Sequence, residues 1–401
     1  MNKTKIMLLQ SYICVASASA AIITPALPHI ERAYALSHGS IEWVVSIFLL
    51  GYVLGQLIYG PLANRYGRLP ALRSGLLINL VGIVICLIAV SIGSYYVLLL
   101  GRLITALGAA AGLACTFILI NELLSKEQAK QAMSFALVFF TVGIGLSVTL
   151  AGIVTQYFHW QYCFWILLFH GIFMFISTWQ FPETLTNPKP LQVSTILIGF
   201  RQALESKQLI KYALIVGLNS AVAYCYSAAA PIYTQSILHL SASQYGYWNL
   251  FNIIGMFASG FLSANLMKRW SAEKVLLCAL ARMVPCIFSL MILSNAAHPN
   301  AFWFFSTTLF LYLFSGLLFP AGSFLASNAI SDKASASSMM SFIYMGSAML
   351  SVIIMGYLPL STLLALITVI TSFLIFAWYL LLSEKSFFHF FGNKIGADLA
   401  E

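Results

Sequence analysis

The sequence is poor in charge. Asp, Glu, Lys and Arg make up 8% of its 401 residues, whereas a typical soluble domain carries about 25%. Hydrophobic residues make up 61%. So few charges cannot cover the surface of a soluble fold, and this excludes cytosolic enzymes, disordered chains and secreted disulfide scaffolds. The composition predicts an integral membrane protein.

Closely spaced cysteine pairs are also lacking. The seven cysteines form an odd-numbered set with no C-x-x-C pair, and each lies inside an apolar run. This pattern argues against a disulfide framework or a zinc site and favours small packing residues. We therefore expect no metal and no cofactor.

Long apolar runs fill most of the chain. A membrane helix needs about 20 apolar residues, and the runs that meet this length are 6–28, 41–62, 73–93, 96–121, 131–156, 161–181, 209–233, 243–266, 274–294, 301–327, 335–358 and 361–383. A polar interval at 182–207 divides them six and six. The expected fold is an all-α membrane protein of twelve transmembrane helices in two six-helix bundles.

This division predicts four segments. They are an N-terminal bundle at 1–185, a cytoplasmic central loop at 186–207, a C-terminal bundle at 208–385 and a cytoplasmic tail at 386–401. Most of the 20 Lys and Arg residues fall in the termini and in alternate connections, which the positive-inside rule places in the cytoplasm. We expect a multi-pass protein of a bacterial inner membrane with both termini cytoplasmic. Because the net charge of +9 orients the chain in the bilayer, it does not indicate a nucleic-acid partner.

The two halves carry similar local features about half the chain apart. Pro25 near the end of the first span corresponds to Pro231 near the end of the seventh, and the segment 60–68 corresponds to 260–269. Parallel repeats of this kind are how two-bundle transporters build a central site.

Several motifs resemble those of the major facilitator superfamily. The loop between spans 2 and 3 is similar to the family signature G-x-L-a-D-r-x-G-r, and the residues at its positions include Gly60, Asn64, Arg65, Gly67 and Arg68. The segments 25–30, 101–108 and 181–185 resemble the family's span 1 end, span 4 motif and span 6 end. The nearest group is the twelve-span drug:proton antiporters of the bicyclomycin and chloramphenicol resistance type. This resemblance implies alternating access, with Pro25 and Pro231 bending during gating, and we expect a monomer.

Three positions depart from the family pattern. Asn64 replaces the acidic residue of the loop motif, Thr105 replaces the span 4 glutamine, and Val148 replaces the span 5 proline. Span 1 also has no acidic residue between Ala20 and Thr24, where relatives often carry one.

Ionisable residues at mid-membrane are few, and none is acidic. Arg102, Arg282 and His170 are the ones predicted there. Two arginines without an acidic partner indicate a positive interior that suits an anionic substrate, although backbone carbonyls could instead neutralise each arginine. His170 titrates near neutrality and is the candidate proton carrier, with packing as the alternative. Arg102 is also a candidate for proton coupling, by resemblance to the family's span 4 arginine.

Neutral polar residues complete the predicted substrate site. Asn219, Tyr226 and Tyr233 recur every seven residues on span 7, and Asn249 and Asn252 lie on span 8. Such stripes face away from lipid and either line a cavity or join helices.

The sequence therefore predicts a transporter rather than an enzyme. The favoured function is proton-coupled export of a small amphipathic molecule with an anionic or zwitterionic group, such as a drug, siderophore or metabolite. Uptake of an organic anion or siderophore is the alternative, since sequence does not fix the direction of flux. A membrane enzyme is less favoured because we find no H-E-x-x-H motif and no Gly-rich phosphate loop. The expected partners are the substrate, a proton and the lipid bilayer.

Overall fold

The computed structural model describes residues 3–37, 39–188, 193–330 and 333–382, and it is helical throughout its regular elements. The elements of the N-terminal half are α1 (Lys3–Ser11), α2 (Ile13–Ala21), η1 (Thr24–Ala26), α3 (Leu27–Ala33), α4 (Trp43–Tyr66), α5 (Arg68–Ile92), α6 (Tyr95–Leu123), α7 (Lys126–Tyr157), α8 (Tyr162–Ser177) and η2 (Thr178–Gln180).

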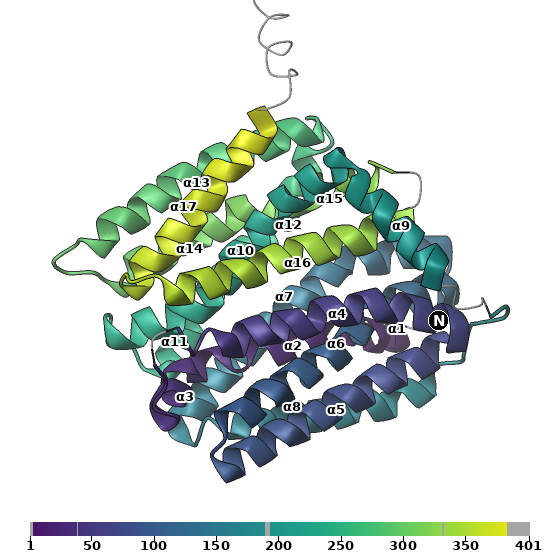
Figure 1. Ribbon diagram of the computed structural model, residues 1–401, viewed down its shortest axis with the longest axis horizontal. Helices are drawn as coiled ribbons and strands as arrows, with labels where there is room; N and C mark the ends of the chain where they lie inside the picture. The colour runs from purple at the N-terminus through teal and green to yellow at the C-terminus, as the bar shows by residue number, and fades with distance from the viewer. Residues whose placement is uncertain (1–2, 38, 189–192, 331–332, 383–401) are drawn as a thin grey trace, which may run out of the picture.

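The C-terminal half repeats the pattern of long helices. Its elements are α9 (Val193–Glu205), α10 (Lys207–Ser236), α11 (Ala242–Trp248), α12 (Leu250–Leu266), α13 (Ala272–Ser294), α14 (Ala301–Gly316), α15 (Leu318–Ser327), α16 (Lys333–Tyr357) and α17 (Thr362–Leu382). Figure 1 shows most of the N-terminal helices below and the C-terminal helices above. The predicted tail 386–401 lies outside the described residues.

The predicted membrane helices are present. In the described part of the chain, eleven helical segments are long and apolar enough to cross a membrane. The remaining predicted span, 243–266, is covered by α11 and α12, which are separated at Asn249. The all-α membrane fold is thus confirmed. All seven cysteines are free, as the sequence predicted.

The predicted central loop is not simply a loop. Residues 193–205 form α9, which packs against α10 and α16. Its buried Ala203 joins a small apolar cluster with Leu209, Ala336 and Met339, whereas Ile198 and Leu204 are exposed. The sequence suggested a loop here because the interval is rich in polar residues, but in α9 these residues occupy only one face of a helix.

The first predicted span is broken rather than continuous. Pro25 has no N–H, so it cannot donate to the carbonyl of Ala21, and α2 ends there. The hydroxyl of Thr24 donates to that carbonyl instead, at 2.9 Å. The chain continues through the short helix η1 into α3, so the first span is interrupted next to Pro25. That it bends there during gating stays a prediction.

Small residues allow the N-terminal helices to approach closely. A Cβ on Gly51 of α4 would lie 2.3 Å from the carbonyl oxygen of Leu103 in α6. A Cβ on Gly108 of α6 would lie 2.2 Å from the backbone nitrogen of Asn79 in α5. These glycines therefore allow close helix packing.

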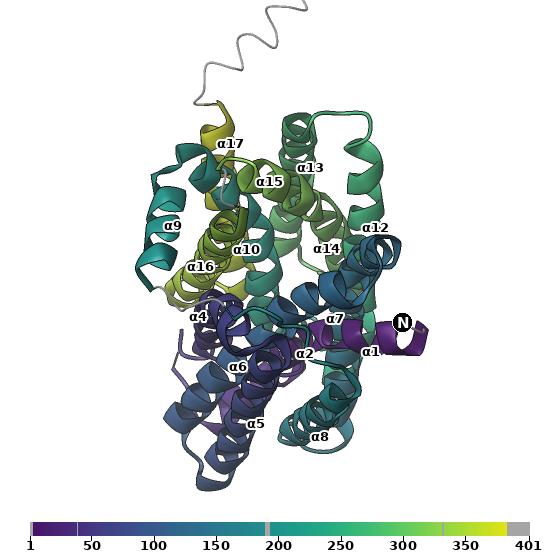
Figure 2. The same ribbon diagram turned by 90° about the vertical axis from the view of Figure 1, so that its right-hand side faces the viewer.

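The two halves pack together mainly in two places. In one, α4 packs against α16, and in the other, α7 packs against α11 and α12. Figure 2 shows α4 with α16 on one side of the molecule and α7 with α12 on the other. We call the end that carries α3, α11 and the α16–α17 connection the α3 end, and the opposite end the α9 end (Figure 1).

Candidate functional site

Arg102 lies inside the N-terminal half. Its side chain is 1% exposed, and its Nη1 donates to the carbonyl of Ser19 at 2.6 Å. Its Nε points to the carbonyl of Val44 at 3.5 Å, and its guanidinium carbon lies 4.4 Å from the centre of the Phe48 ring. Backbone carbonyls and an aromatic face thus neutralise this charge. The sequence had left open whether Arg102 would form a positive substrate site or be neutralised in this way.

Arg282 does not join Arg102. It is exposed on α13, whose described neighbours are helices of the C-terminal half. Val284 and Phe288, which follow it on the same helix, are also exposed. The structure therefore does not bring the two predicted arginines together, because Arg102 is enclosed by its own half and Arg282 is exposed on a helix of the other half.

His170 stands apart from both arginines. It is half-buried on α8, next to Gly171, which packs against Leu80 of α5. It makes no hydrogen bond with any other described residue. Its role in proton coupling stays a prediction.

The predicted polar residues of spans 7 and 8 do come together, on α10, α11, α12 and α14. Asn252 is 1% exposed, donates to the side-chain oxygen of Asn249 at 3.1 Å and accepts from the Thr308 hydroxyl at 2.9 Å. The ring of Tyr226 stacks on Phe304, with centroids 6.0 Å apart. Tyr233 contacts the same ring at 5.1 Å. We call Tyr226, Tyr233, Asn249, Asn252, Phe304 and Thr308 the polar–aromatic cluster.

The two tyrosine hydroxyls of this cluster differ in their surroundings. The Tyr226 hydroxyl lies close to the side chains of Asn252 and Thr308. The Tyr233 hydroxyl is buried and makes no hydrogen bond with another described residue. Buried polar groups normally have a partner, so this hydroxyl calls for an explanation. Asn219, one helical repeat before Tyr226, is half-buried on the same helix. Tyr245 of α11 lies beside Tyr226 and also beside Thr24 of η1, so the cluster reaches the N-terminal half.

Sequence reasoning missed a second group of tyrosines between the halves. Tyr52 of α4 lies close to Tyr224 of α10 and Tyr344 of α16. Each hydroxyl is on a helix that the sequence predicts as a span. Their positions in the middle of predicted spans could have indicated this group, but the prediction included only tyrosines that recur at a seven-residue spacing.

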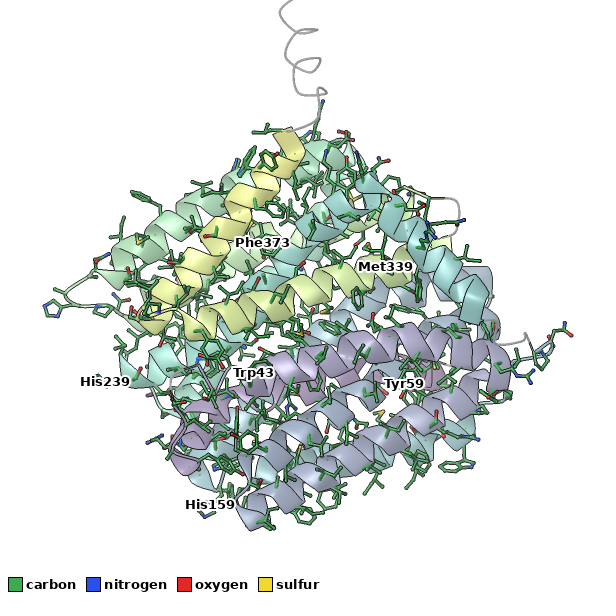
Figure 3. All side chains as sticks on the ribbon, in the orientation of Figure 1. Trp43, Tyr59, His159, His239, Met339 and Phe373 are labelled. Atoms are coloured by element: carbon green, nitrogen blue, oxygen red, sulfur yellow. The ribbon has the colours of Figure 1, made fainter. Side chains whose placement is uncertain are left out.

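The predicted gating prolines lie at the α3 end, where the halves touch. Gln235, one turn after Pro231 in α10, donates from Nε2 to the carbonyl of Pro25 at 3.0 Å. In the same region Trp43 donates from Nε1 to the Tyr357 hydroxyl at 2.9 Å. Trp43 and Tyr59 mark the α3 end and the farther part of α4 in Figure 3.

The loop motif forms a latch at the α9 end, within the N-terminal half. Arg68 forms an ion pair with Glu122 at the end of α6, at 2.8 Å, and its Nη1 donates to the side chain of Asn64 at 3.0 Å. Gly60, Asn64 and Gly67 lie at or near the junction of α4 with α5, and Arg65 is exposed. The sequence located this motif but did not identify Glu122 as its partner.

Glu183 completes the latch from the end of α8. Its carboxylate accepts from the backbone N–H groups of Arg68 and Leu69 at 2.9 Å each, and from those of Thr184 and Leu185 at 2.9 and 2.8 Å. Partial burial by itself raises the pKa of Glu183, but these four N–H groups outweigh it and hold the pKa below its usual value.

Sequence comparison places the chain among known transporters. Residues 11–353 match the Major Facilitator Superfamily. A bicyclomycin resistance protein homologue of Haemophilus influenzae is 23% identical over 282 residues, covering 70% of each chain. Multidrug resistance protein D of Escherichia coli is 24% identical over 327 residues, covering 80% of this chain and 79% of the relative.

Solved structures share the fold. A bacterial homologue of the human lysosomal transporter Spinster, inward-facing and unoccupied, superposes with a TM-score of 0.70 at 14% identity, covering 95% of this chain and 97% of that one. The inward-open xylose transporter XylE of E. coli gives 0.73 at 13% identity, covering 94% and 95%. The helical fold and the family match agree, and the chain belongs to the Major Facilitator Superfamily, whose members are transporters rather than enzymes.

Proposed function

We propose that this protein is a secondary active transporter that exports a small amphipathic molecule by alternating access, driven by proton influx. The observation that carries the proposal is the polar–aromatic cluster, where the buried Tyr233 hydroxyl makes no hydrogen bond with another described residue and Tyr245, beside Tyr226, extends the cluster to the other half of the molecule. The two bundles, 1–185 and 208–385, would rock about this region as a monomer in a bacterial inner membrane.

The contacts between the halves favour an inward-facing state. The Trp43–Tyr357 and Gln235–Pro25 hydrogen bonds both lie at the α3 end. The Thr149 hydroxyl also donates across the halves to the carbonyl of Gly246 in α11, at 3.3 Å. The basic loop motif lies at the α9 end, which the positive-inside rule assigns to the cytoplasm. The outer side is then the closed one.

The chemistry of the cluster favours a substrate with an aromatic or apolar body and a few hydrogen-bonding groups. Tyrosine hydroxyls and asparagine amides both donate and accept, and ring faces offer apolar area. The expectation of an anionic group rested on a positive interior formed by Arg102 and Arg282, which lie apart, one buried and one exposed. We therefore propose a neutral or zwitterionic amphipathic substrate.

Export coupled to protons rests on the relatives and on His170. The named relatives are resistance proteins, which favours efflux. Histidine is the side chain whose unperturbed pKa lies closest to neutrality, and His170 lies on a predicted span, so it remains the candidate proton carrier.

Proteoliposome transport tests the proposal. Purified protein is assayed with labelled bicyclomycin, a planar organic cation and a small carboxylate, first by counterflow without a gradient and then with a pH gradient. We expect counterflow of an amphipathic compound, accelerated by a gradient that carries protons against it. If none of the three compounds shows counterflow, the protein is not a carrier for them and the proposal is contradicted. If counterflow occurs at the same rate with and without the pH gradient, proton coupling is contradicted.

A pair of matched variants tests the site. Removing the hydroxyl in Tyr226→Phe or Tyr233→Phe should weaken binding about 2–10-fold, the equivalent of one hydrogen bond, without destabilising the fold. Tyr96→Phe is the control, since Tyr96 is 82% exposed. Equal affinities in all three variants would remove the cluster from the site.

A further inference from the structure

An arginine is held in place on the N-terminal half where α5 packs against the end of α8. Arg73 of α5 is half-buried. Its Nε donates to the Thr178 hydroxyl of η2 at 3.0 Å, and its Nη2 donates to the Thr178 carbonyl at 3.4 Å. Its guanidinium carbon lies 4.9 Å from the centre of the Trp179 ring. These three contacts fix the position of the guanidinium group.

The charge of Arg73 is not balanced within the described chain. The latch at this end uses Glu122 for Arg68 and Glu183 for backbone N–H groups. Among the described residues, no carboxylate forms an ion pair with Arg73, and no acceptor meets its Nη1 group. A guanidinium group is always charged and binds phosphate through its planar set of N–H donors. The arrangement therefore suits an anion such as a phosphate group.

Arg73 lies at the depth of lipid headgroups. It follows Arg68, the first residue of α5, by five positions, which is about 7–8 Å along the helix axis. Trp179 lies beside it and is 59% exposed. Tryptophan is enriched where a membrane protein meets the headgroups. An anion bound here is thus in contact with the membrane surface at the α9 end.

Two rows of exposed apolar side chains begin at this site. α5 and α8 contact one another and run in opposite directions (Figure 1). On α5 the row continues from Arg73 at helical spacing through Leu77, Val81 and Val84. On α8 it runs back from Trp179 through Ile176, Phe173 and Phe169. From Arg73 to Val84 the helix rises about 16 Å, which is about half of a 30 Å hydrocarbon core. The rows therefore match the acyl chains of one leaflet.

We propose that Arg73, Thr178 and Trp179 form a binding site for an anionic phospholipid in the leaflet at the α9 end. The guanidinium group binds the phosphodiester, the tryptophan ring packs beside the glycerol region, and the acyl chains lie along the two apolar rows. Phosphatidylcholine carries the same phosphate together with an ammonium group, which an unbalanced guanidinium repels, so the site prefers an anionic lipid.

The site is independent of the transported molecule. Both of its helices belong to the N-terminal half, so the site does not form or break when the halves rock against each other. Its ligand is a lipid of the surrounding bilayer rather than a substrate of the polar–aromatic cluster.

Quenching of Trp179 fluorescence by brominated lipids tests the proposal. The protein is reconstituted into dioleoylphosphatidylcholine bilayers with increasing fractions of brominated phosphatidylglycerol or brominated phosphatidylcholine. Because the chain has eight tryptophans, the Trp179 signal is taken as the difference between the unmodified protein and Trp179→Phe. We expect phosphatidylglycerol to bind about fivefold more tightly than phosphatidylcholine, the ratio expected for one basic residue near an anionic surface.

Matched variants separate the site from general surface attraction. Arg73→Gln keeps a donor for Thr178 but loses the charge, so the preference should fall to about one. Arg73→Met takes its place if that variant does not fold. Arg269→Gln is the control, because Arg269 is exposed after α12 next to Trp270, yet no cation–π contact joins the two in the described chain. It should leave the Trp179 preference unchanged.

The outcomes separate three explanations. No preference for phosphatidylglycerol in the unmodified protein, or an unchanged preference without the Arg73 charge, overturns the site. An equal loss in Arg269→Gln shows general attraction to the surface and also overturns it. Displacement of phosphatidylglycerol by inorganic phosphate at constant ionic strength would assign the site to a soluble anion instead of a lipid.

Discussion

Glu183 should stabilise the N-terminal half from a distance of 115 residues in sequence. Its carboxylate accepts the first two N–H groups of α5, which have no partner inside that helix. Replacing a helix-capping side chain with alanine costs about 0.5–2 kcal/mol. Because Glu183 is exposed, solvent screens part of its charge, and we expect Glu183→Ala to lower the free energy of unfolding by about 1–2 kcal/mol.

The glutamine variant separates charge from shape. Glu183→Gln keeps an acceptor oxygen but loses the negative charge, and charge-assisted hydrogen bonds are about twice as strong as neutral ones. Its loss should be about half that of Glu183→Ala. The assay is reversible unfolding in mixed detergent micelles, followed by circular dichroism.

The pH dependence of this difference has a definite sign. The pKa of Glu183 is lower in the folded protein than its usual 4.5, so the folded state favours the carboxylate. The stability that it contributes is fully present above pH 4.5 and is lost as the pH falls through the folded-state pKa. The gap between the unmodified protein and Glu183→Gln should therefore stay constant near neutrality and shrink in acid.

Glu205→Ala provides the control. Glu205 is also exposed near the α9 end, but it only pairs with Arg201 one turn away in α9, at 2.9 Å. Such pairs are worth about 0.3–0.5 kcal/mol. If Glu183→Ala destabilises the protein no more than Glu205→Ala does, the capping argument is refuted.

Three further substitutions test the interior and the outer surface. Arg102→Met should destabilise the fold by about 1–3 kcal/mol, because the Ser19 carbonyl loses its donor, and should change the affinities for acidic and basic substrates equally; a selective loss of acid binding would restore the anionic site. Arg282→Ala should change stability by less than about 0.5 kcal/mol and leave substrate affinity unchanged, because it lies on the surface of α13; a binding titration with the transported compound checks this. Gly108→Ala should cost about 1–3 kcal/mol in unfolding measurements, because the added methyl would meet the Asn79 backbone; an unchanged stability would show that the helices separate freely.

The fold could be predicted from the sequence because its signals are local. Apolar runs of the required length and the loop motif each depend on a single stretch of chain. The helical breaks were less visible: Pro25 ends a helix, whereas Pro231 lies inside α10, which continues past it. The sequence shows the residue but not which neighbouring group, here the Thr24 hydroxyl, compensates for the missing N–H.

The candidate site was only partly predictable, because its partners come from distant helices. Tyr226, Asn249 and Asn252 were found from their spacing, since a polar stripe on a span implies protein contact. The sequence was misleading about the two arginines, because lying on a span does not by itself mean facing the centre of the protein. Each was known to lie on a span, but the sequence does not say which side of the helix faces the centre, and Arg282 faces outward.

The placement of the acidic residues explains how this carrier could work without a carboxylate at mid-membrane. Glu122 and Glu183 hold the α9 end of the N-terminal half, and Glu42 lies between the two halves at the α3 end. Between these ends, the described polar contacts of the central cluster are made by neutral tyrosine, asparagine and threonine side chains. A neutral centre avoids the desolvation that a charge would suffer there. In the proposed mechanism the substrate would therefore bind through neutral groups at the centre.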